Sequence, residues 1–144
     1  MRTLPLLVFL LAASVAAQAQ QSQDLGAFVV HYNTMPTEML SAEVARSYGI
    51  TRSASRALLN IAVMRKSSNG LGEAVTARVA ATATNLNGQL TTVRMREVRE
   101  EGAIYYLGEL RVSHEETFNF EVSVTPEGDS EARSLRFRQQ FFTR

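Results

Sequence analysis

Alternation of apolar and polar residues at every second position is the feature that most constrains the fold of this chain. A side-chain period of two is typical of a β-strand with one buried face. The clearest case is TFNFEVSV, residues 117–124, which places Phe118, Phe120, Val122 and Val124 on one face. Seven segments show the pattern: 25–33, 56–66, 74–85, 90–98, 103–112, 117–124 and 134–142.

Turn-forming residues separate these segments. The stretch 86–88, Leu-Asn-Gly, fits a three-residue hairpin loop with Gly88 in the left-handed conformation. That hairpin predicts Ala81 opposite Val93 and Val79 opposite Met95. It also predicts that Arg78 lies opposite Arg96, a pairing of like charges that is unfavourable without a nearby carboxylate.

Seven short strands joined by regular turns indicate an all-β fold. We predict an antiparallel immunoglobulin-like β-sandwich of about seven strands, with one short helix between the first two. A closed barrel is the alternative.

The predicted helix lies in residues 29–53, VVHYNTMPTEMLSAEVARSYGITRS. Ser41 is a suitable N-cap, and Gly49 fits the left-handed position after the helix. Leu40, Val44 and Tyr48 recur at intervals of four, which places them on one helix face. The simplest interpretation is a plug that lays these three side chains over the open end of the sandwich.

The alternative interpretation is a binding cleft beside this helix. Arginine side chains bind carboxylates and phosphates well because of their forked donor geometry. The candidate ligand-binding residues are His31, Tyr32, Arg46, Arg52 and Arg56. His31 with Met35 and Met39 also offers imidazole and thioether groups that suit copper, but the spacing crosses Pro36 and does not predict a shared face.

The N-terminal residues resemble a cleavable secretory signal. Arg2 precedes an apolar run over 4–15, and Ala17-Gln18-Ala19 offers a cleavage site. We therefore expect residues 1–19 to be removed and 20–144 to form one domain, in the periplasm or secreted. No later run is apolar enough to span a membrane, and the chain has no cysteine.

The charge balance limits the partners. The chain carries 15 basic and 14 acidic residues, so its net charge is +1. Nucleic-acid binding needs a basic surplus, so we do not expect a nucleic-acid partner. Residues 20–99 are net basic and 100–144 net acidic, which cross-strand ion pairs or head-to-tail self-association would both explain.

Enzymatic chemistry is not indicated. The sequence contains no G-x-S-x-G nucleophile motif and no phosphate-binding or dinucleotide-binding loop. His114 lies beside Glu115 and Glu116 in a turn, where neighbouring side chains point apart. We expect no cofactor, and a hydrolase is the remaining enzymatic alternative.

Three stretches together resemble a family of bacterial exported proteins known as domain of unknown function 4426. They are VVHYNTMPTEMLSAEVARSYGITRSASRALLNIAV, ATATNLNGQL and REVREEGAIYYLGELRVSHEETFNFEV. The resemblance covers roughly residues 25–143 and implies a single β-sandwich domain in the periplasm of a Gram-negative bacterium. It supplies no catalytic residues, and Met35 and Met39 lie outside its pattern.

These observations predict a non-enzymatic periplasmic binding or interaction module. Its partner is unknown, and a periplasmic protein or a second copy of the chain are the candidates. The alternative is a protein that binds a small anion or copper in the cleft by the short helix.

Overall fold

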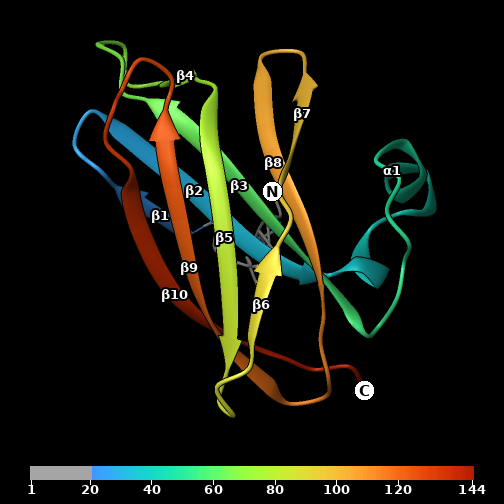
Figure 1. The fold of residues 1–144 in the computed structure, drawn as a ribbon. Coiled ribbons are helices and arrows are strands. Elements are labelled where there is room, and N and C mark those ends of the chain that lie inside the picture. Colours follow the sequence, from blue (N-terminus) through green and yellow to red (C-terminus); the bar gives the residue numbers. More distant parts are fainter. Residues whose placement is uncertain (1–20) are drawn as a thin grey trace, which may run out of the picture.

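Two antiparallel sheets stacked face to face make up residues 21–144, which are the residues that the structure, a computed structural model, describes (Figure 1). The six-stranded sheet has the order β1-β2-β3-β8-β7, with β4 paired to β3. Its strands are β1 (Gln21–Asp24), β2 (Phe28–Pro36), β3 (Arg56–Arg65), β4 (Glu73–Ala74), β7 (Arg96–Glu100) and β8 (Ala103–Arg111). The four-stranded sheet has the order β10-β9-β5-β6. Its strands are β5 (Ala77–Asn85), β6 (Leu90–Val93), β9 (Glu116–Pro126) and β10 (Arg133–Phe141).

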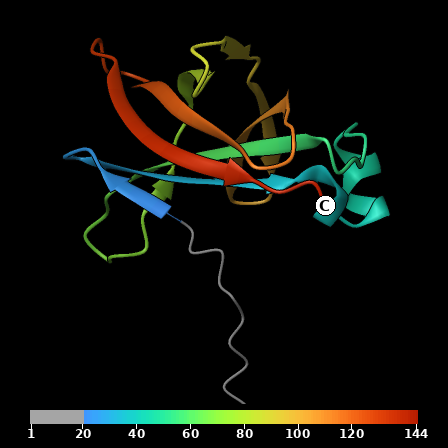
Figure 2. The same ribbon diagram turned by 90° about the horizontal axis from the view of Figure 1, so that it is seen from below.

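This architecture confirms the predicted all-β antiparallel sandwich, and Figure 2 shows the two layers from the side. The core lies between them and consists of the side chains that the alternation placed inward. The buried residues among those include Phe28, Val30, Leu59, Ile61, Val63, Tyr106, Leu110, Phe118, Phe120, Val122, Val124, Leu135 and Phe141. Burial of this apolar area is the main stabilising contribution to the fold.

Two segments predicted as single strands are each divided between the sheets. In 74–85, β4 pairs with β3 while β5 joins the other sheet. In 90–98, β6 pairs with β5, and β7 then crosses to pair with β8. Alternation cannot reveal such a crossing. The inner faces of both sheets are apolar, so a strand shows the same two-residue alternation in either sheet.

The crossing corrects the predicted register. Ala81 lies opposite Val93, as predicted for the hairpin with Gly88 at φ +81°. The predicted pairing of Val79 with Met95 is wrong, because the ladder between β5 and β6 ends at Val93. The predicted opposition of Arg78 and Arg96 is also wrong. Arg78 lies opposite Thr125, and Arg96 lies opposite Leu107 in the other sheet.

Tyr106 on β8 links the two sheets near the point where the chain crosses from β6 to β7. Its hydroxyl accepts a hydrogen bond from the Ala77 backbone N–H at 2.7 Å and donates to Glu97 Oε1 at 3.0 Å. Burial raises the pKa of the Tyr106 phenol, and the Glu97 carboxylate raises it further. The Arg99 side chain, followed by Tyr106, lowers the pKa of Glu97. The phenol therefore stays protonated, and its oxygen accepts the hydrogen bond from the backbone N–H of Ala77, the first residue of β5.

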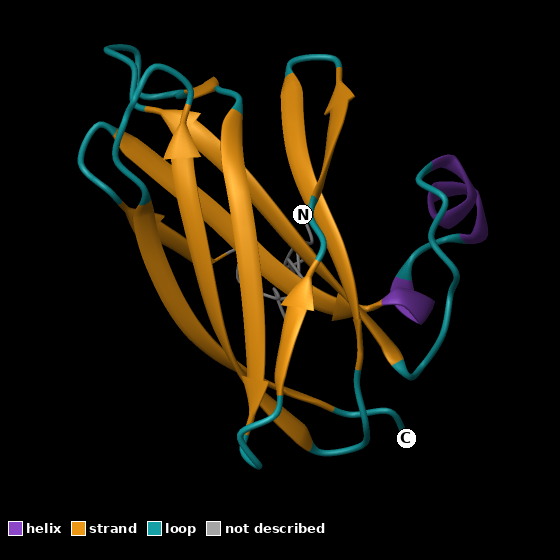
Figure 3. Ribbon diagram, in the orientation of Figure 1, coloured by secondary structure: helices purple, strands orange, loops and turns teal. Residues whose placement is uncertain are grey.

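The helical insert between β2 and β3 contains η1 (Thr37–Met39) and α1 (Ala42–Ser47), shown in purple in Figure 3. The Val44 N–H donates to Ser41 Oγ at 3.1 Å, which confirms the predicted N-cap. Buried Thr37 holds the return loop, because its hydroxyl accepts from the Ser53 N–H at 2.8 Å and donates to the Thr51 carbonyl at 2.9 Å.

The predicted plug is wrong in position, and one of its three predicted contact residues is exposed. Ala45 and Ile50 are buried apolar residues of the insert, and they pack with Leu58 and Leu107 in a second cluster outside the sandwich core. Leu40 and Tyr48 are partly buried against that cluster, whereas Val44 is 40% exposed. The insert therefore covers the part of the outer face of the six-stranded sheet around Leu58 and Leu107.

Candidate functional site

The outer face of the six-stranded sheet carries an unusual group of polar side chains beside the helical insert. The ladder between β2 and β3 places His31 opposite Ala62 and Asn33 opposite Asn60. These residues alternate with core residues such as Val30 and Ile61, so their side chains face away from the sandwich interior. The arrangement puts two amides and an imidazole close together on a half-buried surface.

Two cavities meet at His31 on this face. The smaller has a volume of about 30 Å³ and is lined by His31, Tyr32, Asn33, Asn60, Ala62 and Tyr105. The larger has a volume of about 380 Å³ and is lined by Val29, His31, Met64, Arg65, Lys66, Ser67, Gly70, Leu71 and Gly72. We call the two cavities together the His31 groove.

Asn60 is the chemically distinctive residue of the groove. Its Oδ1 atom is buried and has no hydrogen-bond partner, the one such side-chain atom found among the described residues. An unsatisfied buried acceptor costs about 1–3 kcal/mol. A cavity of about 30 Å³ is large enough to hold a water molecule. Oδ1 has almost no surface accessible to solvent, so a molecule in the small cavity does not reach it in this arrangement.

The cations at the rim of the larger cavity already have partners within the chain. Lys66 Nζ lies 2.6 Å from Asp24 Oδ2, and this hydrogen bond is the main cause of the lowered pKa of Asp24. The Arg65 guanidinium lies 5.8 Å from the centre of the Phe28 ring. The remaining lining is largely apolar, and Leu71 is 81% exposed at the edge of the cavity.

The five residues predicted for an anion cleft do not gather at one point. His31 faces outward, whereas the ring of Tyr32 stacks on Phe137 with its centroid at 4.4 Å. Arg52 Nη2 donates to the Glu38 carbonyl at 3.0 Å, and Arg56 Nε lies 3.5 Å from Glu109 Oε1. Arg46 is exposed in the last turn of α1. Of the five, His31 and Tyr32 line the small cavity, and His31 also lines the larger one.

The predicted copper ligands are also separated. Met35 packs against the cluster under the helical insert, and Met39 is exposed on η1. Met64 is the methionine that lines a cavity with His31. No cluster of three or more His, Cys, Asp or Glu side chains suited to a metal occurs within residues 21–144.

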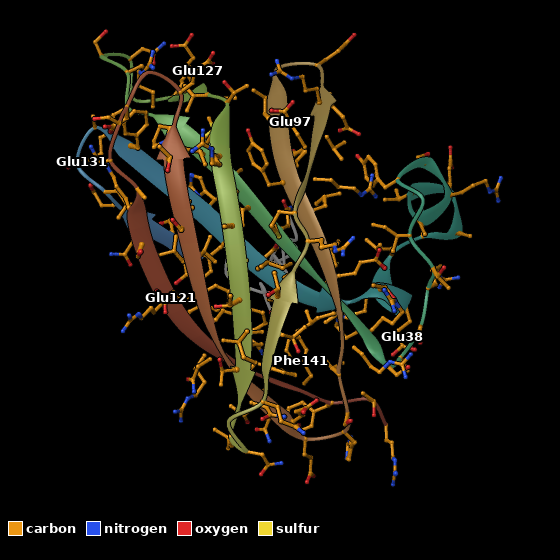
Figure 4. All side chains as sticks on the ribbon, viewed as in Figure 1. Glu38, Glu97, Glu121, Glu127, Glu131 and Phe141 are labelled. Atoms are coloured by element: carbon orange, nitrogen blue, oxygen red, sulfur yellow. The ribbon has the colours of Figure 1, made fainter. Side chains whose placement is uncertain are left out.

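His114, the second histidine, lies outside the groove. Its Nδ1 accepts a hydrogen bond from the Thr143 N–H at 3.1 Å, and its Nε2 lies 3.6 Å from Glu115 Oε1. The acidic side chains are dispersed as well. Figure 4 shows Glu38 in η1 of the insert, Glu97 on β7 and Glu121 on β9, well apart from one another.

Sequence reasoning missed Asn60, Met64, Leu71 and Tyr105. Asparagine is depleted in strands, so the presence of Asn33 and Asn60 within predicted strands was the sequence feature that could have indicated a polar site. Their direct opposition follows from the register of β2 and β3, which no local pattern contains.

The fold and the groove define a small antiparallel β-sandwich with a ligand-sized depression on one outer face. The chain belongs to the family described as Domain of unknown function (DUF4426), whose model matches residues 22–144. This result confirms the resemblance seen in the sequence. The comparison with curated proteins gave no match.

One solved structure supports the same assignment, and two others show the same fold. A DUF4426 family protein from Pseudomonas aeruginosa PAO1 is 33% identical with a TM-score of 0.76, and the match covers 88% of this chain and 97% of that chain. A copper-bound variant of FetP from uropathogenic Escherichia coli strain F11 is 12% identical with a TM-score of 0.61, over 85% and 95% of the two chains. As-isolated FetP, expressed recombinantly in the E. coli periplasm, is 10% identical with a TM-score of 0.60, over 85% and 93%. The two FetP structures share the fold with this chain.

Within the described residues, none of the helices has the length and apolar character needed to cross a membrane.

Proposed function

We propose that this chain is an exported, non-enzymatic binding module and that the His31 groove is its ligand site. The observation that carries the proposal is the cavity of about 380 Å³ in which the apolar side chains of Val29, Met64 and Leu71 lie beside the imidazole of His31. A concave, mostly apolar depression with a few polar groups is the usual form of a small-molecule site.

Export is supported by the sequence. The secretory signal predicted for residues 1–19 lies outside the described residues. The family match begins at residue 22, close to the expected mature N-terminus at Gln20. FetP, which shares the fold, was expressed in the periplasm. These points favour a periplasmic or secreted protein with one domain.

Three carboxylates have pKa values lowered by neighbouring groups. The pKa of Asp24 is lowered by Lys66, that of Glu97 by Arg99, and that of Asp129 by the Glu131 backbone N–H and then by Arg133. A general acid at neutral pH needs a raised pKa, so none of these three carboxylates is suited to that role. Because the sequence also contains no G-x-S-x-G motif, we rank a hydrolase below a binding module.

The chain offers a matched pair of histidine variants for testing the groove. Isotope-labelled protein is mixed with fractions of periplasmic extract and followed by NMR, residue by residue. We expect at least one fraction to shift the signals of Val29, His31, Asn60 and Leu71. His31→Ala should abolish the shifts, and His114→Ala should leave them unchanged. Shifts that persist in His31→Ala, or the absence of any shift at the groove, contradict the proposal.

A second candidate function is copper binding in the same groove. The observation that favours it is that the His31 imidazole and the Met64 thioether line one cavity, and both groups suit copper in its reduced form. FetP, with the same fold, has been obtained with copper bound.

Methionine variants separate copper binding from general groove effects. In a competition titration with Cu(I), we expect Met64→Leu to weaken binding about tenfold or more, a free-energy change of about 1.4 kcal/mol. Met39→Leu removes an exposed thioether outside the groove and should have no effect. Equal affinities for the two variants would rule out Met64 as a ligand.

A further inference from the structure

Two Asn-Gly pairs lie in exposed turns of the molecule. Asn69-Gly70 lies between β3 and β4, and Asn87-Gly88 lies at the tip of the β5–β6 hairpin (Figure 1). In such a pair, the backbone nitrogen of the glycine can attack the side-chain carbon Cγ of the asparagine. Glycine favours this attack because it has no Cβ atom to crowd its nitrogen. The two pairs contain the same residue types, so a difference in their reactivity must come from their surroundings.

The reaction converts the side-chain amide into a carboxylate in two steps. First the bond from the glycine nitrogen to Cγ forms, the bond from Cγ to the amide nitrogen breaks, and ammonia leaves with the proton of the glycine N–H. The product is a five-membered succinimide ring. Water then opens the ring at one of its two carbonyl carbons, and the ring nitrogen regains a proton. Opening at one carbon gives aspartate. Opening at the other gives isoaspartate, in which the main chain runs through Cβ and Cγ.

The side chain of Asn69 is held in place by its own turn. Its Oδ1 atom accepts a hydrogen bond from the Leu71 N–H at 3.0 Å and another from the Ser67 hydroxyl. The Ser67 oxygen is fixed in turn, because it accepts from the Gly72 N–H at 3.1 Å. Ring closure requires the asparagine side chain and the next peptide group to turn toward each other. At Asn69 this movement must first disrupt the two hydrogen bonds to Oδ1.

The side chain of Asn87 is exposed, and it takes part in none of the hydrogen bonds found in the part of the chain that the structure describes. The fixed side chain of this turn is the buried Asn85, whose Oδ1 accepts from the N–H groups of Asn87 at 3.1 Å and Gln89 at 2.9 Å. The glycine nitrogens do not distinguish the pairs, because Gly88 and Gly70 each donate to a backbone carbonyl, at 3.0 and 3.1 Å. The difference between the two pairs therefore lies in the asparagine side chains.

We propose that Asn87 is a site of spontaneous deamidation and isoaspartate formation in the folded protein, and that its turn protects Asn69. Conversion of Asn87 also loosens the β5–β6 hairpin. Asn85 Oδ1 binds N–H groups on both sides of the Asn87–Gly88 linkage, and isoaspartate inserts an extra main-chain carbon between them. One oxygen then no longer matches both N–H groups. The modification site lies outside the His31 groove and does not depend on the proposed function.

Peptide mapping of the full chain tests the site. The protein is kept at mildly alkaline pH, where the glycine nitrogen loses its proton more readily, and samples are taken over time. Trypsin cleaves after Lys66, Arg78 and Arg94, which places Asn69 and Asn87 on different peptides. Mass spectrometry with electron-transfer fragmentation measures aspartate and isoaspartate at each position. We expect Asn87 to convert about tenfold faster than Asn69, as the breaking of one or two hydrogen bonds at Asn69 implies.

Unfolding in urea is the matched control, because it removes the turn contacts and leaves both Asn-Gly pairs intact. The rates at Asn69 and Asn87 should then become similar. Ser67→Ala removes one of the two donors to Asn69 Oδ1, so in the folded protein it should raise the rate at Asn69 about threefold. The rate at Asn87 should not change in this variant. The urea control keeps the proposal testable even if Ser67→Ala does not fold.

Hydrogen exchange measures the effect of conversion on the hairpin. In isoaspartate-containing protein separated by chromatography, the Gln89 N–H should exchange about tenfold faster than in unmodified protein, because its hydrogen bond to Asn85 is weakened. Unchanged exchange at Gln89 would contradict the loosening of the hairpin. Conversion of Asn69 at the same rate as Asn87 in the folded chain, a ratio of rates that urea does not alter, or the absence of conversion at Asn87 would each overturn the modification site.

Discussion

Replacing Phe120 with alanine should destabilise the protein by about 3–5 kcal/mol, the range for removing a buried phenylalanine from a core. Phe120 is 1% exposed and lies on β9, in the middle of its sheet. Its ring stacks on Phe137 with centroids 4.8 Å apart and meets Phe141 edge-on at 6.3 Å. The truncation therefore leaves a cavity and breaks an aromatic cluster.

Phe142→Ala is the matched control for Phe120→Ala. It removes the same atoms from a side chain that is 56% exposed. The control should change the free energy of unfolding by no more than about 0.5 kcal/mol, as exposed substitutions usually do. Urea denaturation followed by circular dichroism measures both variants. Similar losses for the two would mean that Phe120 does not lie in the core of the folded protein.

Gly108→Ala should destabilise the protein by about 1–3 kcal/mol through overpacking. A Cβ atom at Gly108 would lie 2.5 Å from Met95 Sδ, 2.6 Å from Val93 Cγ1 and 3.0 Å from the Arg94 carbonyl oxygen. These residues form the crossing between β6 and β7. The glycine is therefore required for the close approach of the crossing chain to β8.

A double-mutant cycle identifies the cause of the Gly108→Ala loss. Met95→Ala removes the flexible side chain nearest to the added methyl group, so Gly108→Ala should cost less in that background than in wild type. Contacting residues are expected to be coupled in this way. Strict additivity of the two unfolding free energies would show that Met95 does not limit the space at Gly108.

Much of the sandwich follows from local features of the sequence. The alternation in 117–124 assigns Phe118 and Phe120 to the core, and both are buried. The three-residue loop ending at Gly88 sets Ala81 opposite Val93. Ser41 caps α1 as its residue type and position suggest. Each of these features depends on residues within one strand, turn or helix end.

The wrong predictions concern segments whose side chains could lie in more than one part of the fold. In RALLNI, Leu58 and Leu59 are adjacent and point to opposite faces, so one enters the core and the other needs a second cover. The helical insert supplies that cover through Ala45 and Ile50, and the predicted plug overlooked this need. Likewise, the alternation in 90–98 is the same whether the strand continues or crosses to the other sheet.

The sequence by itself determined which face of each strand is buried and that the chain reverses at residues 86–88. Both features depend on the side-chain period and on local backbone preference. Only the tertiary structure decided which strands are neighbours. That choice brings Asn33 opposite Asn60 and places His31 between two cavities. The physical reason is that strand neighbours are selected by packing between distant segments, and a groove on the sheet surface exists only after that packing is complete.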